Sequence, residues 1–145
     1  MSVLPPRRLL ISRSQLGQMQ DHIVALAPEE ACGLLAGEVE GDTCQALRVI
    51  PMHNMLHSPV QYRMEPSEQL AAFNEIEAGG MELVGIYHSH PAGPEEPSPV
   101  DIAEAYYPEV VYLIWTRKSD AWQCKGYSVY DRDVCPVEIL VNEAE

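Results

Sequence analysis

Two histidines separated by a single residue follow directly after an apolar run. His88 and His90 come after residues 83–87, Leu-Val-Gly-Ile-Tyr, which we expect to form a strand. Side chains two positions apart in a strand point to the same face, so the two imidazoles would emerge side by side and could share one metal ion. Because such pairs also arise by chance, a third ligand is needed before they indicate a metal site.

A carboxylate downstream of the pair is a candidate for that third ligand. A proline-rich segment, residues 91–97, leads to Ser98 and Pro99, which are residue types preferred at a helix N-cap and at the first helical position. Asp101 then lies in the first helical turn, where the helix dipole and free N–H groups favour its ionised form. Two neutral imidazoles and a carboxylate suit a catalytic zinc site, which leaves a fourth position for water. Asp101 could also cap the helix, a role that does not exclude metal ligation.

The spacing of these residues resembles the signature of a known family. His88-Ser89-His90, seven residues, Ser98, two residues and Asp101 match the pattern H-[ST]-H-x₇-S-x₂-D of the JAMM metallopeptidases, also called MPN-plus domains. Upstream, PEEACGLLAG resembles the second motif of the family, in which a glutamate precedes a small apolar pair and a glycine. Matched residue by residue, that glutamate is Glu30, with its neighbour Glu29 as the alternative. The resemblance covers nearly the whole chain, and every signature position is filled.

This resemblance implies a fold, a metal and a role for each signature residue. The fold would be the α/β MPN (JAMM) fold, a mixed β-sheet flanked by helices and similar to that of the cytidine deaminases. His88, His90 and Asp101 would hold one zinc ion per chain. Glu30 would take a proton from the attacking water and deliver it to the departing amine, and Ser98 would donate a hydrogen bond to the developing oxyanion.

The same resemblance implies a class of substrate. The chain has no room for the insertions of the larger eukaryotic members and is similar to the compact prokaryotic ones, which are associated with small ubiquitin-like sulfur carriers. We therefore expect a zinc-dependent hydrolase of amide or isopeptide bonds. It would cleave after the C-terminal Gly-Gly tail of a small ubiquitin-like or sulfur carrier protein, for example to release a C-terminal cysteine or peptide.

Two other classes of protein are less compatible with these residues. A non-catalytic MPN-type binding module is the main alternative, but such scaffolds lack the metal ligands, and here each ligand position is filled. A zinc deaminase would need a His-x-Glu motif followed by paired cysteines, and the sequence has neither. The sequence leaves open the identity of the carrier, the released residue, the oligomeric state and the metal loaded in the cell.

Hydrophobic periodicity predicts the elements that position these residues. A first helix would begin at Ser12, with Gln15 completing a capping box, and end at Pro28. A second would begin at Pro66 and Ser67 and end at 79–80, and a short third would begin at Ser98. Strands are expected at 8–11, 31–39, 43–50, 83–87, 110–116, 122–130 and 137–141. On the second helix we expect a buried stripe formed by Leu70, Phe73 and Ile76.

Composition and charge favour one soluble domain spanning residues 1–145. The chain has 145 residues, of which 46% are hydrophobic and 21% charged. Its net charge of −13 would repel phosphate backbones and anionic headgroups, so neither nucleic acid nor a membrane is an expected partner. No signal peptide is evident and the cysteines form no CxxC pair, so we expect a cytoplasmic protein with free thiols at Cys32, Cys44, Cys124 and Cys135.

Several other residues of reactive types lie outside this signature. His22 lies on the first predicted helix, where a solvated or packed role is expected. His53 and His57 lie in a loop that could approach the site, and their roles stay open. Cys32 invites a nucleophile interpretation, but its strand context favours a small buried residue. The pair Glu95-Glu96 could select a basic substrate or could simply belong to a solvated loop.

Overall fold

The computed structural model describes residues 5–142, and within them seven strands close into a barrel. The strands follow one another around the barrel in the order β1-β3-β2-β4-β5-β6-β7. Their bounds are β1 (Arg8–Ser12), β2 (Cys32–Glu40), β3 (Thr43–Met52), β4 (Glu82–His90), β5 (Val111–Lys118), β6 (Ala121–Tyr130) and β7 (Asp133–Asn142). The helices are α1 (Arg13–Leu26), α2 (Pro66–Ala78) and α3 (Pro99–Ala103). The expected α/β fold is confirmed, with the sheet closed on itself.

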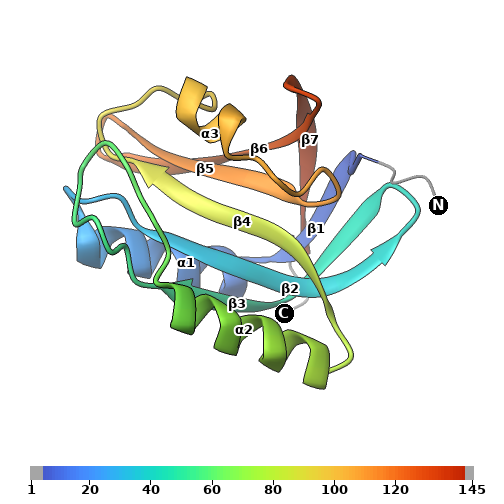
Figure 1. Cartoon of the computed structure of the whole chain (residues 1–145). Coiled ribbons are helices and arrows are strands. Elements are labelled where there is room, and N and C mark those ends of the chain that lie inside the picture. The colour runs from blue at the N-terminus through green and yellow to red at the C-terminus, as the bar shows by residue number, and fades with distance from the viewer. Residues whose placement is uncertain (1–4, 143–145) are drawn as a thin grey trace.

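The sheet mixes parallel and antiparallel pairs. β2 runs antiparallel to both β3 and β4, and β4 runs parallel to β5. β5, β6 and β7 follow as antiparallel neighbours. β1 closes the barrel, because it pairs in parallel with β3 on one side and with β7 on the other. Figure 1 shows α1 and α2 on the side of the molecule formed by β2 and β3, and α3 over β5 and β6.

β4 occupies the middle of this arrangement and carries the two histidines to its end. It is buried continuously from Val84 to His90, which is expected of a strand that has neighbours on both edges and packing on both faces. The strand predicted at 83–87 extends through the histidines themselves. His88 pairs with Cys32 of β2 and with Ile114 of β5, so the ladder holds the backbone of this ligand on both sides.

Helix α1 begins as the sequence predicts. The Ser12 hydroxyl accepts a hydrogen bond from the Gln15 backbone N–H at 3.1 Å, and the Gln15 side chain accepts one from the Ser12 N–H at 3.0 Å. The Gln15 amide also donates to the Ala46 carbonyl at 3.1 Å and so ties the start of the helix to β3. Met19 and Ile23 then pack into one of the two hydrophobic clusters.

Helix α2 corrects one prediction. Leu70 was expected to belong to the buried stripe, yet it is 61% exposed, and Ala72 and Ile76 are the buried residues, with Phe73 half-buried. At 3.6 residues per turn, Leu70 lies roughly 160° around the helix from Ala72. Only the side of α2 that carries Ala72 and Ile76 is covered by the sheet, so Leu70 remains exposed to solvent.

His22 is packed, which agrees with one of the two roles expected for it. Its Nδ1 lies 2.7 Å from the hydroxyl of Tyr87, a fully buried residue of β4. The two rings meet edge to face. Within residues 5–142, no helix has the length and apolar character required to cross a membrane.

Candidate metal centre

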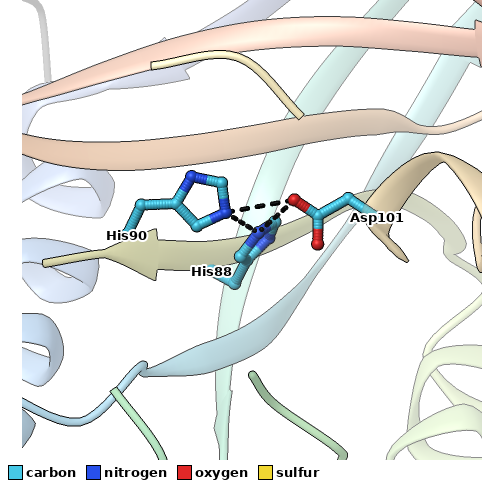
Figure 2. Close-up of side chains that lie close together, drawn as sticks. All are labelled: His88, His90 and Asp101. Atoms are coloured by element: carbon cyan, nitrogen blue, oxygen red, sulfur yellow. Dashed lines mark hydrogen bonds and ion pairs between the residues drawn. The ribbon is translucent and has the colours of Figure 1, made fainter. Parts of the chain in front are cut away.

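Three side chains converge at the end of β4 and the start of α3. His88 Nε2 and His90 Nε2 lie 2.9 Å apart. Asp101 Oδ2 lies 3.1 Å from His88 Nε2 and 3.0 Å from His90 Nε2. Figure 2 shows the three atoms pointing toward a common centre. The structure therefore brings together the three residues that the sequence nominated as metal ligands.

The N-terminus of α3 explains why Asp101 faces the histidines. Ser98 is the N-cap, and its hydroxyl accepts a hydrogen bond from the Asp101 N–H at 3.0 Å. In return, Asp101 Oδ2 accepts one from the Ser98 N–H at 2.8 Å. This reciprocal capping box fixes the rotamer of Asp101, so the carboxylate that caps the helix also faces the two imidazoles. The two alternatives considered for Asp101 are thus compatible in one geometry.

The pKa values of the three residues suit metal binding. Burial lowers the pKa of His88 and keeps its imidazole neutral. Burial alone would raise the pKa of Asp101, but the hydrogen bonds from His88 and His90 hold it well below its usual range. Burial also opposes protonation of His90, but the Asp101 carboxylate raises its pKa. An anionic oxygen beside imidazole nitrogens is the donor set that zinc accepts.

The spacing of the donor atoms also fits an ion. Zinc bound tetrahedrally at about 2.0–2.1 Å from each ligand would separate neighbouring ligand atoms by roughly 3.3 Å. The observed separations of 2.9, 3.0 and 3.1 Å are only slightly shorter. Small movements of three side chains would therefore admit the ion without a change in backbone.

Glu30 lies beside the triad, two residues before the start of β2. The residue is 4% exposed, and within residues 5–142 its carboxylate has no hydrogen-bond partner. Burial, with a smaller contribution from the Asp101 charge, raises its pKa to about 7 although His90 opposes the shift. Its neighbour Glu29 is partly exposed and lies 3.1 Å from His57 Nδ1. Of the two glutamates that the sequence left open, the structure places Glu30 at the site and turns Glu29 to the surface.

The other reactive residues lie apart from the triad. His53 pairs with Glu68 and His57 with Glu29, both through exposed imidazoles. Cys32 is fully buried, and burial raises the pKa of its thiol to about 12, which makes it a poor nucleophile. The expectation of a small buried residue at this position is confirmed. The four cysteines are free thiols, also as expected.

Two residues of the site were missed by the sequence analysis. The ring of Tyr62 stacks on the His88 imidazole, with centroids 4.7 Å apart and planes at 28°. Asn54 is buried and its amide donates to the carbonyls of Glu30 and Gln61, each at 3.0 Å. Neither follows an apolar periodicity or a metal-binding motif, so no signal in the sequence marked them. Both belong to the segment between β3 and α2 that passes the end of β4 (Figure 1).

The chain matches known proteins over the region that contains this centre. A family model described as prokaryotic homologs of the JAB domain matches residues 12–125. A relative from Thermus thermophilus, "Probable TtuB-protein conjugate cleaving protease", is 41% identical over 108 residues, covering 74% of this chain and 69% of the relative. The "CysO-cysteine peptidase" of Mycobacterium tuberculosis is 35% identical over 136 residues, covering 93% of this chain and 92% of the relative. The solution structure of a Desulfitobacterium hafniense protein superposes with a TM-score of 0.84 at 34% identity, covering 93% of each chain.

Proposed function

Because the chain belongs to the family of prokaryotic JAB-domain (JAMM) peptidases, we propose that it is a zinc-dependent hydrolase of amide or isopeptide bonds. Its substrate would be a small ubiquitin-like or sulfur carrier protein, cleaved after a C-terminal Gly-Gly tail. The observation that carries this proposal is the convergence of His88, His90 and Asp101 within 3.1 Å of one another, beside a buried glutamate. We further propose that residues 1–145 act as one domain, since β1 and β7 together close the barrel.

His88, His90 and Asp101 would hold the metal ion. When bound, zinc supplies a Lewis acid that polarises a carbonyl oxygen and lowers the pKa of a water molecule toward about 7. Buried, neutral His88 offers a lone pair without a proton to lose, and ionised Asp101 offsets part of the charge of the ion.

Glu30 is the group that would move protons. With a pKa of about 7, its carboxylate can take a proton from the attacking water and return it to the departing amine near neutral pH. The absence of a hydrogen-bond partner among the described residues leaves both of its oxygens available for this transfer. Ser98 would stabilise the oxyanion: its oxygen caps α3 as an acceptor, so its O–H is still available to donate.

The surface beside the metal centre supports an extended, narrow substrate. A hollow next to His88 and Asp101 is lined by Tyr62, Glu104 and Tyr112. The same three residues line a second, more open groove that also contains Leu56 and Tyr106. A tail that lacks side chains could pass from the groove to the metal centre where a bulkier segment would not. The relatives are named for a TtuB-protein conjugate and for CysO-cysteine, so the group released here would be a protein, a peptide or a cysteine.

The test pairs zinc content with cleavage of a ubiquitin-like carrier extended beyond Gly-Gly. We expect about one zinc per chain in the wild type, in Glu30→Gln and in Glu29→Gln, as one open metal site requires. Glu29→Gln is the matched control because it changes the neighbouring carboxylate that faces outward. Cleavage should persist in the control and fall by roughly 10²–10⁴-fold in Glu30→Gln. His88→Ala should lose both zinc and cleavage.

Two results would overturn this function. A wild-type protein that binds no zinc would leave a binding module as the better interpretation. Equal turnover by Glu30→Gln and the wild type would exclude Glu30 as the proton carrier even if zinc were bound.

A further inference from the structure

The loop of residues 91–97, which joins His90 to Ser98, is held by side chains of strand β6. Gln123, Lys125 and Tyr127 alternate along β6, so their side chains point to the same face. The carboxylate of Glu95 accepts hydrogen bonds from the Gln123 amide and from Lys125 Nζ, the latter at 3.2 Å. The Tyr127 hydroxyl donates to the Glu95 backbone carbonyl at 2.9 Å. We name these four residues the Glu95 clamp.

The clamp acts on the peptide unit next to a metal-ligand contact. The carbonyl of Pro94, one residue before Glu95, accepts a hydrogen bond from His90 Nδ1 at 2.8 Å. A neutral imidazole carries its proton on one nitrogen only, so a proton at Nδ1 leaves the lone pair at Nε2. Nε2 is the atom that faces Asp101 and His88, while Nδ1 points away from them (Figure 2). The Pro94 carbonyl therefore favours the form of His90 that offers the Nε2 lone pair to a metal, whereas the Asp101 carboxylate beside Nε2 favours the opposite form when no metal is bound.

His88 shows that this control is particular to His90. Within residues 5–142, the buried Nδ1 of His88 has no hydrogen-bond partner. Its ring is oriented by complete burial and by stacking on Tyr62. Packing can hold the plane of a ring, but it does not select which nitrogen carries the proton.

We propose that the Glu95 clamp is a positioning device for the metal centre: Tyr127 and Lys125 hold the Glu95 peptide so that the Pro94 carbonyl stays against His90 Nδ1. This inference rests on the proposed function, because it concerns the same metal. It gives β6, which supplies no ligand to the proposed site, a part in setting metal affinity. It also assigns Glu95, whose carboxylate is engaged by two donors, to positioning rather than to selecting a basic substrate.

Substitution of the buried Tyr127 tests the clamp most directly. Tyr127→Phe removes one hydroxyl and leaves the ring, which is 8% exposed, in place. Tyr130→Phe is the matched control: Tyr130 lies on the same strand, is 51% exposed, and its hydroxyl makes no hydrogen bond among the described residues. Lys125→Met changes a side chain that is 49% exposed, so it tests the clamp without disturbing the interior.

Three quantities should be measured for each variant. The first is zinc affinity, measured by competition with a chelator of known affinity. The second is the protonation pattern of His90, measured by ¹⁵N–¹H correlation NMR of the metal-free protein above the pKa of the ring. The third is the unfolding midpoint of the metal-free protein. Removing an outer partner of a metal-bound histidine typically weakens metal binding by about 10–100-fold. We expect a weakening of about 10-fold in Tyr127→Phe, a smaller one in Lys125→Met and none in Tyr130→Phe. The fraction of neutral His90 that carries its proton on Nδ1 should be larger in the wild type than in Tyr127→Phe, where the Asp101 carboxylate beside Nε2 meets less competition for the proton.

The outcomes separate this inference from the proposed function. Wild-type zinc affinity and an unchanged His90 pattern in both Tyr127→Phe and Lys125→Met would overturn the clamp, even if Tyr127→Phe unfolded more easily. If the wild type bound no zinc, the proposed function would fail. The NMR pattern of the metal-free protein would still show whether the clamp orients His90.

Discussion

Glu30 and Asp101 are carboxylates of the same site, yet their surroundings move their pKa values in opposite directions. Asp101 is partly buried, but it accepts hydrogen bonds from two imidazoles and from the Ser98 N–H, which stabilise the ionised form. Glu30 is buried without such donors among the described residues, so desolvation dominates and raises its pKa to about 7. One carboxylate is thereby suited to hold a cation and the other to exchange a proton.

The raised pKa of Glu30 predicts a pH-dependent cost in stability. Between its ordinary value of 4.5 and about 7, the unfolded chain releases the Glu30 proton while the folded protein retains it. The folded state then binds more protons, so the free energy of unfolding falls as pH rises through this window. Glutamine does not ionise, so Glu30→Gln should escape the loss and become the more stable protein above pH 7, by at most about 3 kcal/mol.

Denaturant unfolding of the metal-free proteins at a series of pH values measures this difference. The gap between Glu30→Gln and the wild type should open from pH 4.5 to 7 and then stay constant, while Glu29→Gln serves as the control for a partly exposed carboxylate. A gap independent of pH would show that Glu30 keeps an ordinary pKa in the folded protein.

At the residue scale, the sequence predicted that His88, His90 and Asp101 would lie together, as they do, but not which residues hold them in place. The ligand positions and Ser98 follow fixed spacing within fourteen residues, 88–101, and local structure determines how they meet. Asn54 reaches Glu30 across 24 residues and Tyr127 reaches Glu95 across 32. Such contacts depend on how strands pair, and a single sequence contains no local signal for them.

At the scale of elements, the segment between β3 and α2 depends on Asn54. Its Oδ1 accepts from the N–H groups of Leu56 and Arg63, and its amide donates to the carbonyls of Glu30 and Gln61. Both polar atoms of one buried side chain therefore close the loop and tie it to Glu30, two residues before β2. Tyr62, which stacks on His88, lies within this loop.

Asn54→Ala should release the segment. Four hydrogen bonds at about 0.5–1.5 kcal/mol each predict a loss of roughly 2–6 kcal/mol in the free energy of unfolding, partly because the Glu30 carbonyl would remain buried without a donor. Amide hydrogen exchange should accelerate at residues 55–63. Asn74→Ala, an exposed change on α2, should leave both measurements near wild-type values. Similar exchange rates in the two variants would show that packing alone holds the loop.

The pairing of β2 with β4 next to the site depends on a glycine, Gly33, which lies opposite Tyr87. A Cβ at Gly33 would lie 2.2 Å from the ring of Tyr87, which is fully buried and paired with His22. Gly33→Ala should therefore displace the ring and cost about 1–3 kcal/mol of stability. Gly17→Ala is the contrasting control: nothing lies within 4 Å of its added Cβ on α1, and a gain of about 0.5–1 kcal/mol is expected from helix propensity. Thermal or denaturant unfolding should show a lower stability for Gly33→Ala and a higher stability for Gly17→Ala, each relative to the wild type.

The helices and strands were largely predictable from the sequence. The wrong prediction concerns the burial of a helix residue, which depends on the element that packs against it. Caps at Ser12 and Ser98 were found because a cap is a local hydrogen-bond pattern. The exposure of Leu70 was not predicted, because periodicity shows which side of a helix is apolar but not how much of that side the sheet covers. The range expected for β4 ended at Tyr87, but the two histidines were already expected two positions apart on one face of a strand, and β4 extends through them.

At the scale of the whole molecule, the closure of the barrel joins parts of the chain that are farthest apart in sequence. Arg8 to Ser12 pair with Glu138 to Asn142, and the same strand pairs with the start of β3. The sequence predicted both strands but not their pairing, because the period of a strand is the same whichever neighbour it has. Closure leaves β4 at the centre, where its ladder supports the two histidines from both sides.

The net charge predicts how the whole molecule responds to salt. With 22 acidic and 9 basic residues, the folded protein carries −13 charges near pH 7, and bringing them together opposes compaction. Ion pairs such as Arg8–Asp42 and Arg117–Asp120 are exposed and contribute little. Screening should therefore relieve more repulsion than attraction, and the unfolding midpoint should rise by about 3 °C between roughly 10 and 200 mM NaCl at pH 8. Near the isoelectric point of about 4.6 the net repulsion vanishes and the rise should vanish with it. A midpoint that falls with salt at pH 8 would mean that the exposed ion pairs outweigh the net charge.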